Sequence, residues 1–117
     1  NIPTHLAVDD ITTLTATASN LASSFATAID LSGASADVAF TLDNGTDVGQ
    51  LKVIYASTEP ASSYVANVTV TSWGTSATGS NQIVLSTLGE AVICFWSGTA
   101  WFVIADSGLT ASRPAIT

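Results

Sequence analysis

The chain has 117 residues, which is enough for one domain with a single core. Only 9% of the residues are charged, and nine acidic residues against two basic ones give a net charge of -7. Nucleic-acid phosphates and anionic membranes attract proteins with several cations, so we do not expect this chain to bind nucleic acid. The longest apolar run, residues 91–96, is far shorter than the roughly 20 residues of a membrane span, so we do not expect a membrane protein either.

The low charge also bears on how the protein works. Ordinary soluble domains carry roughly 25% charged residues, so much of this surface must consist of Ser, Thr, Ala and Gly. A sparsely charged surface offers little repulsion against association. We therefore expect a protein that works inside a homo-oligomer or a larger assembly.

Both ends of the chain are predicted to be extended arms. The arms comprise residues 1–10 and 107–117, on either side of a single β-domain of residues 11–106, and Pro3 and Pro114 favour extended conformations in them. Such segments can lie on a neighbouring subunit by β-addition, and plain disorder of the ends is the alternative.

The first third of the domain is predicted to contain two strands, residues 11–18 and 25–31. Threonine stands at positions 12, 13, 15, 17 and 27, and it loses side-chain freedom in a helix, whereas it fits a pleated surface. The Ala-rich residues 20–26 leave a short helix as the alternative for that stretch.

A period of two residues marks the next strands. In residues 37–42, Val38, Phe40 and Leu42 share one face, and residues 43–49 form a reversing loop rich in Asp, Asn and Gly. The same alternation predicts three further strands, in residues 50–56, 64–70 and 82–86. In the first, Leu51, Val53 and Tyr55 share a face; in the second, Tyr64, Ala66, Val68 and Val70 do; in the third, Ile83 and Leu85 point inward.

The last two runs, residues 91–96 and 101–105, are apolar on both faces and are joined by residues 97–100. This pattern predicts a central hairpin that is covered on both sides. A count of about eight strands then predicts an all-β fold, an antiparallel β-sandwich or jelly roll with extended terminal arms.

A search for catalytic groups predicts no enzyme. The one histidine, His5, lies in an arm, and Cys94 lies in an apolar strand with no neighbouring cation in sequence to activate it. Most of the acidic residues fall in turns or at strand ends, where carboxylates cap backbone donors, and no pattern requires them to meet as an acid and base pair.

No cofactor or metal is predicted either. One Cys and one His cannot make a zinc site, and residues 43–47 resemble a calcium loop only superficially, because no carboxylate follows at the position of the bidentate ligand. Among the aromatic residues, Trp96 and Trp101 are predicted to be core or interface residues, whereas Trp73 is predicted to be exposed and leaves a sugar-binding surface as an alternative.

Several short segments between residues 36 and 108 resemble virion structural proteins of tailed bacteriophages, notably phages of aquatic bacteria. The resemblance rests on residues 49–55, 67–70, 82–85, 89–91 and 98–103, and on a strand that ends at Trp96, turns at Gly98 and returns through Trp101. It implies a β-rich module, commonly trimeric, that decorates heads or forms part of fibres, and it implies no catalytic residues.

Together these observations predict a decoration or cement protein on the outer capsid surface of the virion. Its expected partners are other copies of itself, most simply in a trimer, and the major capsid protein. A tail-fibre, spike or other receptor- or carbohydrate-binding module is the alternative. Apolar residues of the two arms are the candidate interface residues, namely Ile2, Pro3, Leu6, Val8, Leu109, Pro114 and Ile116.

Overall fold

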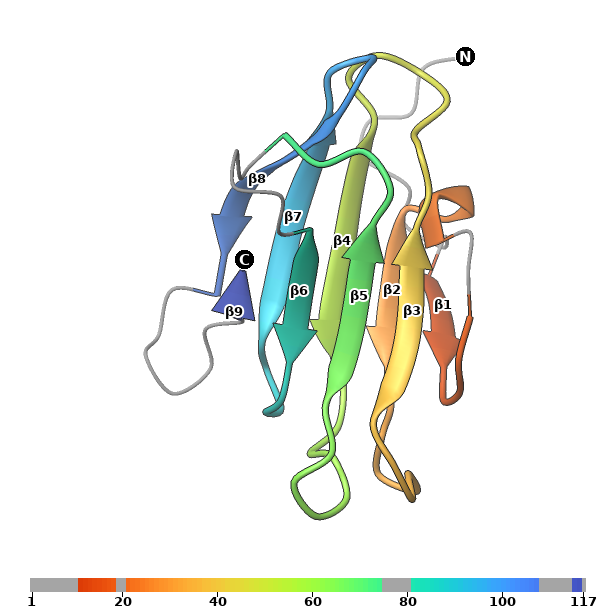
Figure 1. The fold of residues 1–117 in the computed structure, drawn as a ribbon, viewed down its shortest axis with the longest axis vertical. Coiled ribbons are helices and arrows are strands. Elements are labelled where there is room, and N and C mark those ends of the chain that lie inside the picture. Colours follow the sequence, from red (N-terminus) through yellow and green to blue (C-terminus); the bar gives the residue numbers. More distant parts are fainter. Residues whose placement is uncertain (1–10, 19–20, 75–80, 108–114, 117) are drawn as a thin grey trace.

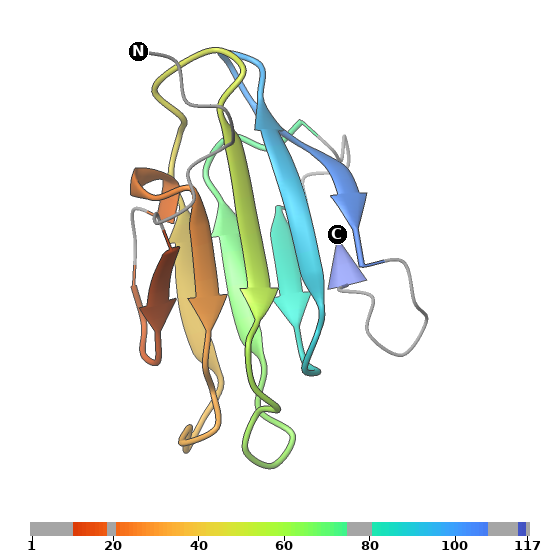
Figure 2. The same ribbon diagram turned by 180° about the vertical axis from the view of Figure 1, so that it is seen from behind.

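The computed structural model describes residues 11–18, 21–74, 81–107 and 115–116, which form two β-sheets packed face to face (Figure 1). Sheet A has the strand order β1 (Ile11–Leu14), β2 (Ala26–Ile29), β4 (Leu51–Ala56), β7 (Ala91–Trp96), β8 (Trp101–Asp106). Sheet B has the order β3 (Val38–Leu42), β5 (Ala66–Val70), β6 (Gln82–Leu85), β9 (Ala115–Ile116). The predicted all-β sandwich is thereby confirmed, and the view from behind shows sheet A in front (Figure 2).

The core lies between the sheets and is built by the alternation that the sequence predicted. Phe40 and Leu42 of β3, Val68 and Val70 of β5, and Ile83 of β6 are each at most 1% exposed. Sheet A contributes inner residues of its own strands, among them Ile29, Ile54, Val92, Cys94 and Trp101. The predicted shared faces of β3, β5 and β6 are therefore the core faces.

The sheets are mixed, so the prediction of a purely antiparallel sandwich is wrong. Three strand pairs are parallel, β1 with β2, β2 with β4 and β3 with β5. The chain crosses from sheet A to sheet B after β2 and returns after β3, and each crossing reverses its direction. Strands separated by two such crossings run the same way, which period-two patterning within a strand does not reveal.

The β7–β8 hairpin forms as predicted, but its predicted central, doubly covered position is wrong. Gly98 has a φ of 105°, which suits the first central residue of the tight turn, and Ser97 donates its N–H to the carbonyl of Ala100 at 3.0 Å. The strand β8 lies at the edge of sheet A, where Phe102 and Ile104 are 40% and 58% exposed. The sequence identified a hairpin that is apolar on both sides, but not its edge position.

The first third of the domain follows the strand prediction in part. The strands β1 and β2 lie within the two predicted segments, and between them a single 3-10 turn, η1 (Leu21–Ser23), lies in the stretch where a short helix was the alternative. Ala18 then bridges to Phe40 at the free edge of β3, where its carbonyl accepts the Thr41 N–H at 3.0 Å. This segment thus links the edges of both sheets on one side of the sandwich.

Candidate interaction surface

The outer face of sheet A is apolar across all five of its strands. The pairing register aligns three rows of outward side chains, each crossing neighbouring strands. We call this surface the apolar face, and its rows consist of Leu51, Phe95 and Phe102; Ile11, Ala26, Val53, Ile93 and Ala105; and Thr13, Ala28, Tyr55 and Ala91.

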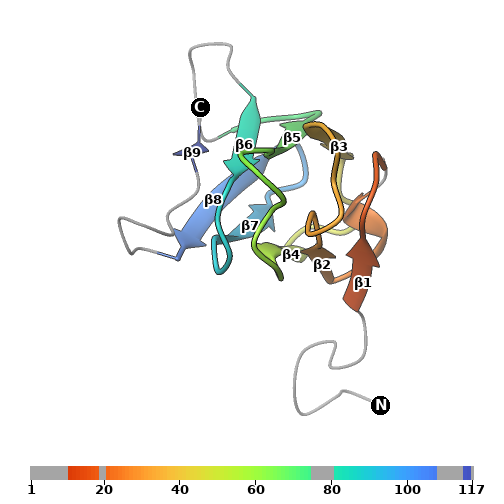
Figure 3. The same ribbon diagram turned by 90° about the horizontal axis from the view of Figure 1, so that it is seen from below.

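No described element covers the apolar face (Figure 3). Ile11 at one edge is 53% exposed and Phe102 at the other is 40% exposed, while Leu51, Val53, Tyr55 and the outward residues of β7 are half-buried. Ile104, the extra residue of a β-bulge in β8, adjoins this face and is 58% exposed. In contrast, Ala26 and Ala28 of β2 are only 4% and 3% exposed, so the accessible apolar area of this face is interrupted at β2.

The central strand β4 turns its charged residue away from this face and into the core. Lys52 is fully buried, and its Nζ donates to the Ser24 carbonyl and the Ser24 hydroxyl, each at 3.0 Å, and to the Thr27 hydroxyl at 2.6 Å. The predicted set Leu51, Val53 and Tyr55 does share a face, and that face is the outer one. The apolar face thus carries no charge in its central strand.

Cys94 is the cross-strand neighbour of Lys52 inside the sandwich. Burial raises the pKa of its thiol to about 12, an effect that the positive charge of Lys52 partly opposes. The thiol is therefore neutral at physiological pH, and the sequence-based interpretation of Cys94 as a small buried residue is confirmed.

The outer face of sheet B differs in chemistry. Its two rows, which we call the polar face, consist of Ala39, Asn67 and Val84, and of Thr41, Thr69 and Gln82. The row of Thr41, Thr69 and Gln82 is wholly polar, whereas in the other row Asn67 stands between Ala39 and Val84. The polar face suits contact with solvent, whereas the apolar face does not.

Several acidic residues accept hydrogen bonds from backbone N–H groups in turns and loops, as the sequence predicted for most of them. Asp37 accepts the Val65 N–H at 3.0 Å and Glu59 accepts the Leu88 N–H at 3.1 Å. Glu90, which is buried, accepts the N–H groups of Ser86 and Thr87 in the turn before β7. None of the carboxylates within the described ranges lies in the rows of the apolar face.

The prediction that Trp73 is exposed is wrong. Its side chain is half-buried and packs against the core, and its backbone forms a parallel bridge with Trp101 at the edge of sheet A. The Gly74 N–H donates to the Trp101 carbonyl at 2.8 Å, which fixes this segment beside β8. Trp96 and Trp101 are buried with ring centroids 5.3 Å apart, so their prediction as core residues is confirmed.

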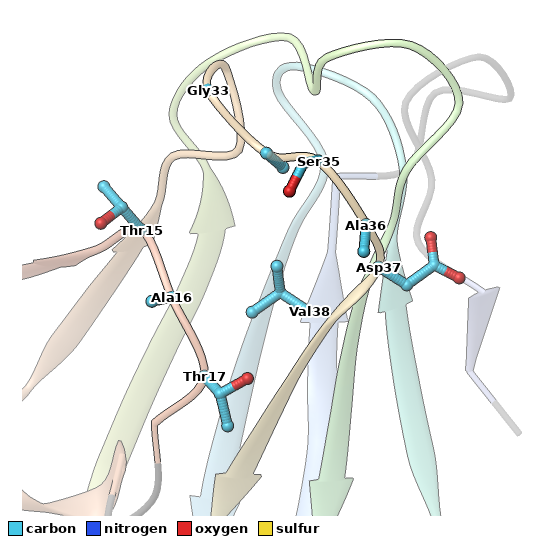
Figure 4. A pocket seen from close by; sticks show the side chains of 9 residues that line it. Thr15, Ala16, Thr17, Gly33, Ser35, Ala36, Asp37 and Val38 are labelled. Atoms are coloured by element: carbon cyan, nitrogen blue, oxygen red, sulfur yellow. The ribbon is translucent and has the colours of Figure 1, made fainter.

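A small open hollow of about 270 Å³ lies between residues 15–17 and residues 33–38 (Figure 4). The polar residues among its lining are Thr15, Thr17, Ser35 and Asp37, and the carboxylate of Asp37 points away from residues 15–17 (Figure 4). One oxygen of that carboxylate already accepts the Val65 N–H. The hollow offers small polar groups but no aromatic platform for a sugar and no cation for a phosphate.

Of the predicted interface residues, the structure describes only Ile116. It lies in β9 opposite Ile83 and packs partly buried against the core of its own chain. The other candidates lie outside the described residues, namely Ile2, Pro3, Leu6, Val8, Leu109 and Pro114.

Sequence reasoning missed the apolar face itself. The available signal was the apolar character of residues 91–96 on both sides of the strand, together with the shared face of Leu51, Val53 and Tyr55. Both features were compatible with strands buried on two sides, so the pattern alone did not identify an open surface.

Within the described parts of the chain, no three His, Cys, Asp or Glu side chains are grouped closely enough to hold a metal ion. Within the same parts, no helix has the length and apolar character needed to cross a membrane. In comparisons with known proteins, no family model matches the chain, and no curated protein sequence matches it.

Proposed function

We propose that this protein is a structural protein of a tailed-phage virion that decorates the outer capsid surface and stabilises the shell as a homo-oligomer, with three copies as the proposed assembly. The single observation that supports this proposal best is the difference between the two outer faces. One face carries apolar side chains on all five strands of sheet A, and the other includes a wholly polar row of Thr41, Thr69 and Gln82.

Such a protein needs no chemistry. A module that binds the assembled shell and not its dissociated subunits shifts the equilibrium toward assembly by its binding free energy, and the effect is repeated over many copies. Removal of apolar surface from water contributes roughly 25 cal/mol per Å² to that free energy, reduced by the cost of immobilising the partners. The major capsid protein is the proposed second partner.

The charge distribution supports a role in an assembly rather than one in binding nucleic acid. The chain has a net charge of -7, and Lys52, one of its two basic residues, is buried in the core. A phosphate-binding surface requires several accessible cations. The capsid genome is therefore not the proposed partner, and a position outside the shell agrees with this charge.

The proposal is tested with emptied heads of the phage that encodes the chain, prepared without it. Purified chain is added, unbound chain is removed by sedimentation, and the occupancy and thermal stability of the heads are measured. We expect saturable binding and a higher temperature of head disruption. A chain that ignores heads but binds host cells or purified surface glycans would be a receptor-binding module instead.

A further inference from the structure

The loop between β3 and β4 contacts both buried tryptophans of the β7–β8 hairpin. The Asp43 carbonyl accepts the Trp101 Nε1–H at 2.8 Å, and Gly45 lies so close to Trp96 that a Cβ at this position would stand 2.5 Å from the Trp96 Cγ. Any larger residue at position 45 would displace Trp96, which is only 5% exposed. The packing therefore requires a glycine directly after Asn44.

An asparagine followed by a glycine can modify itself. Asparagine is one of the thermolabile residues, and a following residue without a Cβ lets its backbone nitrogen approach the asparagine Cγ. In this reaction the Gly45 nitrogen bonds to the Asn44 Cγ, the bond from Cγ to Nδ2 breaks, and the proton of the Gly45 N–H leaves with Nδ2 as ammonia. Water then opens the resulting succinimide ring, which leaves either an aspartate or an isoaspartate.

The structure leaves both reacting groups free to meet. Asn44 is exposed and lies outside the strands and turns. Among the residues that the structure describes, none forms a hydrogen bond with the Asn44 side chain or with the Gly45 N–H, whereas the Thr46 N–H donates to the Gln50 Oε1 at 2.8 Å. Water reaches the same loop, since Thr46 and Val48 are exposed as well.

The other two asparagines in the described residues are held in place. Asn67 lies within β5 and is followed by Val68, a β-branched residue with no exposed surface. Asn81 donates its Nδ2 to the Val70 carbonyl at 3.2 Å, which engages the amide that would have to leave. Asn67 and Asn81 therefore serve as internal controls for Asn44.

We infer that Asn44 and Gly45 form a site of spontaneous deamidation, with water as the only co-reactant, and that the isoaspartate product loosens the loop from Trp101. An isoaspartate inserts an additional methylene group into the main chain between Asp43 and Gly45. The hydrogen bond to Trp101 and the contact with Trp96 were both made at the original chain length, so the loop has to shift. The inference concerns the chain alone and does not depend on the proposed capsid role.

The test is incubation of the purified full chain in warm, mildly alkaline buffer, beside the same chain unfolded in urea and the variant Asn44→Gln. Isoelectric focusing follows the added negative charge, and peptide mass spectrometry locates it. Asn44→Gln is the matched control, because glutamine keeps the amide but has to close a larger ring that forms more slowly.

We expect the net charge of -7 to become more negative by one unit in the folded chain, through conversion at Asn44 while Asn67 and Asn81 stay intact. Asn44→Gln should keep its charge. An Asn44 that converts only in urea would show that the fold holds the Gly45 nitrogen away from Cγ, and it would overturn the inference. Conversion at Asn67 or Asn81 before Asn44 would overturn it as well.

The effect on the loop is measured on the isoaspartate form after its separation by charge. Its thermal unfolding and tryptophan fluorescence are compared with those of Asn44→Asp, which carries the same charge without the additional methylene group. We expect the isoaspartate form to unfold at a lower temperature than Asn44→Asp, with fluorescence shifted to longer wavelength. Equal melting temperatures and equal spectra would overturn the inferred loosening of the loop from Trp101.

Discussion

The two outer faces of the sandwich are made by the same kind of strand and differ in what they present to water. On sheet B, the row Thr41, Thr69 and Gln82 is polar, whereas on sheet A the row Leu51, Phe95 and Phe102 is apolar. Both sheets cover one common core. The comparison teaches that burial in the core does not account for all the apolar residues, because one outer face carries many of them as well.

The inner side of sheet A sharpens this comparison. Strand β4 places Lys52 in the core and Val53 toward the outside, the reverse of the usual arrangement for a strand with one buried face. The ammonium is satisfied by oxygens of Ser24 and Thr27. A charged residue is therefore accommodated inside at some cost while the outer face stays free of charge.

The largest expected effect is a loss of folding free energy, and it distinguishes a core residue from a neighbouring residue of the apolar face. Trp101→Ala removes a fully buried ring that packs on Trp96 and whose Nε1 donates to the Asp43 carbonyl at 2.8 Å, and it should lower the free energy of unfolding by about 3–5 kcal/mol. The adjacent Phe102→Ala should cost about 1 kcal/mol in the monomer. Urea unfolding of the two variants and of the unchanged chain measures both losses, and equal losses would show that Phe102 belongs to the core.

The next effect compares the two sides of β4. Lys52→Met removes the donor from the Ser24 carbonyl and from the hydroxyls of Ser24 and Thr27, and should lower the free energy of unfolding by about 1–3 kcal/mol because these buried acceptors lose their partner. Val53→Met, on the outer side of the same strand, should change it by less than about 1 kcal/mol. Urea midpoints at an unchanged m-value measure the difference, and a more stable Lys52→Met would show that burying the charge costs more than its hydrogen bonds return.

A third change makes a row of the polar face apolar, and so tests whether apolar character alone causes association. The double substitution Thr41→Val with Thr69→Val converts one row of sheet B, and the free energy of unfolding should change by less than about 1 kcal/mol because both residue types suit strands. Sedimentation should then show species larger than those of the unchanged chain, because a second apolar face permits open-ended association. An unchanged mass would indicate that apolar character alone does not drive contact.

The smallest expected effect concerns acid and the loop after β2. Hydrogen bonds from the Ser32 hydroxyl and N–H, and from the Thr58 hydroxyl, lower the pKa of Asp30 below its ordinary value of 3.8. A depressed folded pKa contributes stability above the unfolded pKa and loses it as pH falls through the folded value. The melting temperature of Asp30→Asn should therefore lie slightly below that of the unchanged chain above about pH 4 and converge with it in stronger acid. A constant difference down to pH 2 would contradict this assignment.

Much of the local structure followed from the sequence. The alternation at Val38, Phe40 and Leu42 predicted a strand and its shared face, and the hairpin through Gly98 was predicted as well. Turn-capping by Glu90 was also accessible, because a carboxylate in a turn bonds nearby backbone donors. These features depend on neighbours close along the chain or on the period of one strand.

The candidate surface followed from the sequence only as separate fragments. Alternation indicates which residues of a strand share a face, but it does not indicate which of the two faces packs against the other sheet. Lys52 looks like an outward residue until Ser24 and Thr27, more than twenty positions earlier, bring it three oxygen acceptors in the core. The apolar face then forms because β1, β2, β4, β7 and β8 align their outward residues in register.

By itself, therefore, the sequence determined that the chain forms short strands around one apolar core, with sparse charge and carboxylates in turns. Only the tertiary structure decided that β8 lies at an edge, that β2 and β4 run parallel, and that Val53 faces outward. The physical reason is that strand order, direction and the buried side are set by free energies summed over residues far apart in the chain, whereas propensity and periodicity depend on near neighbours.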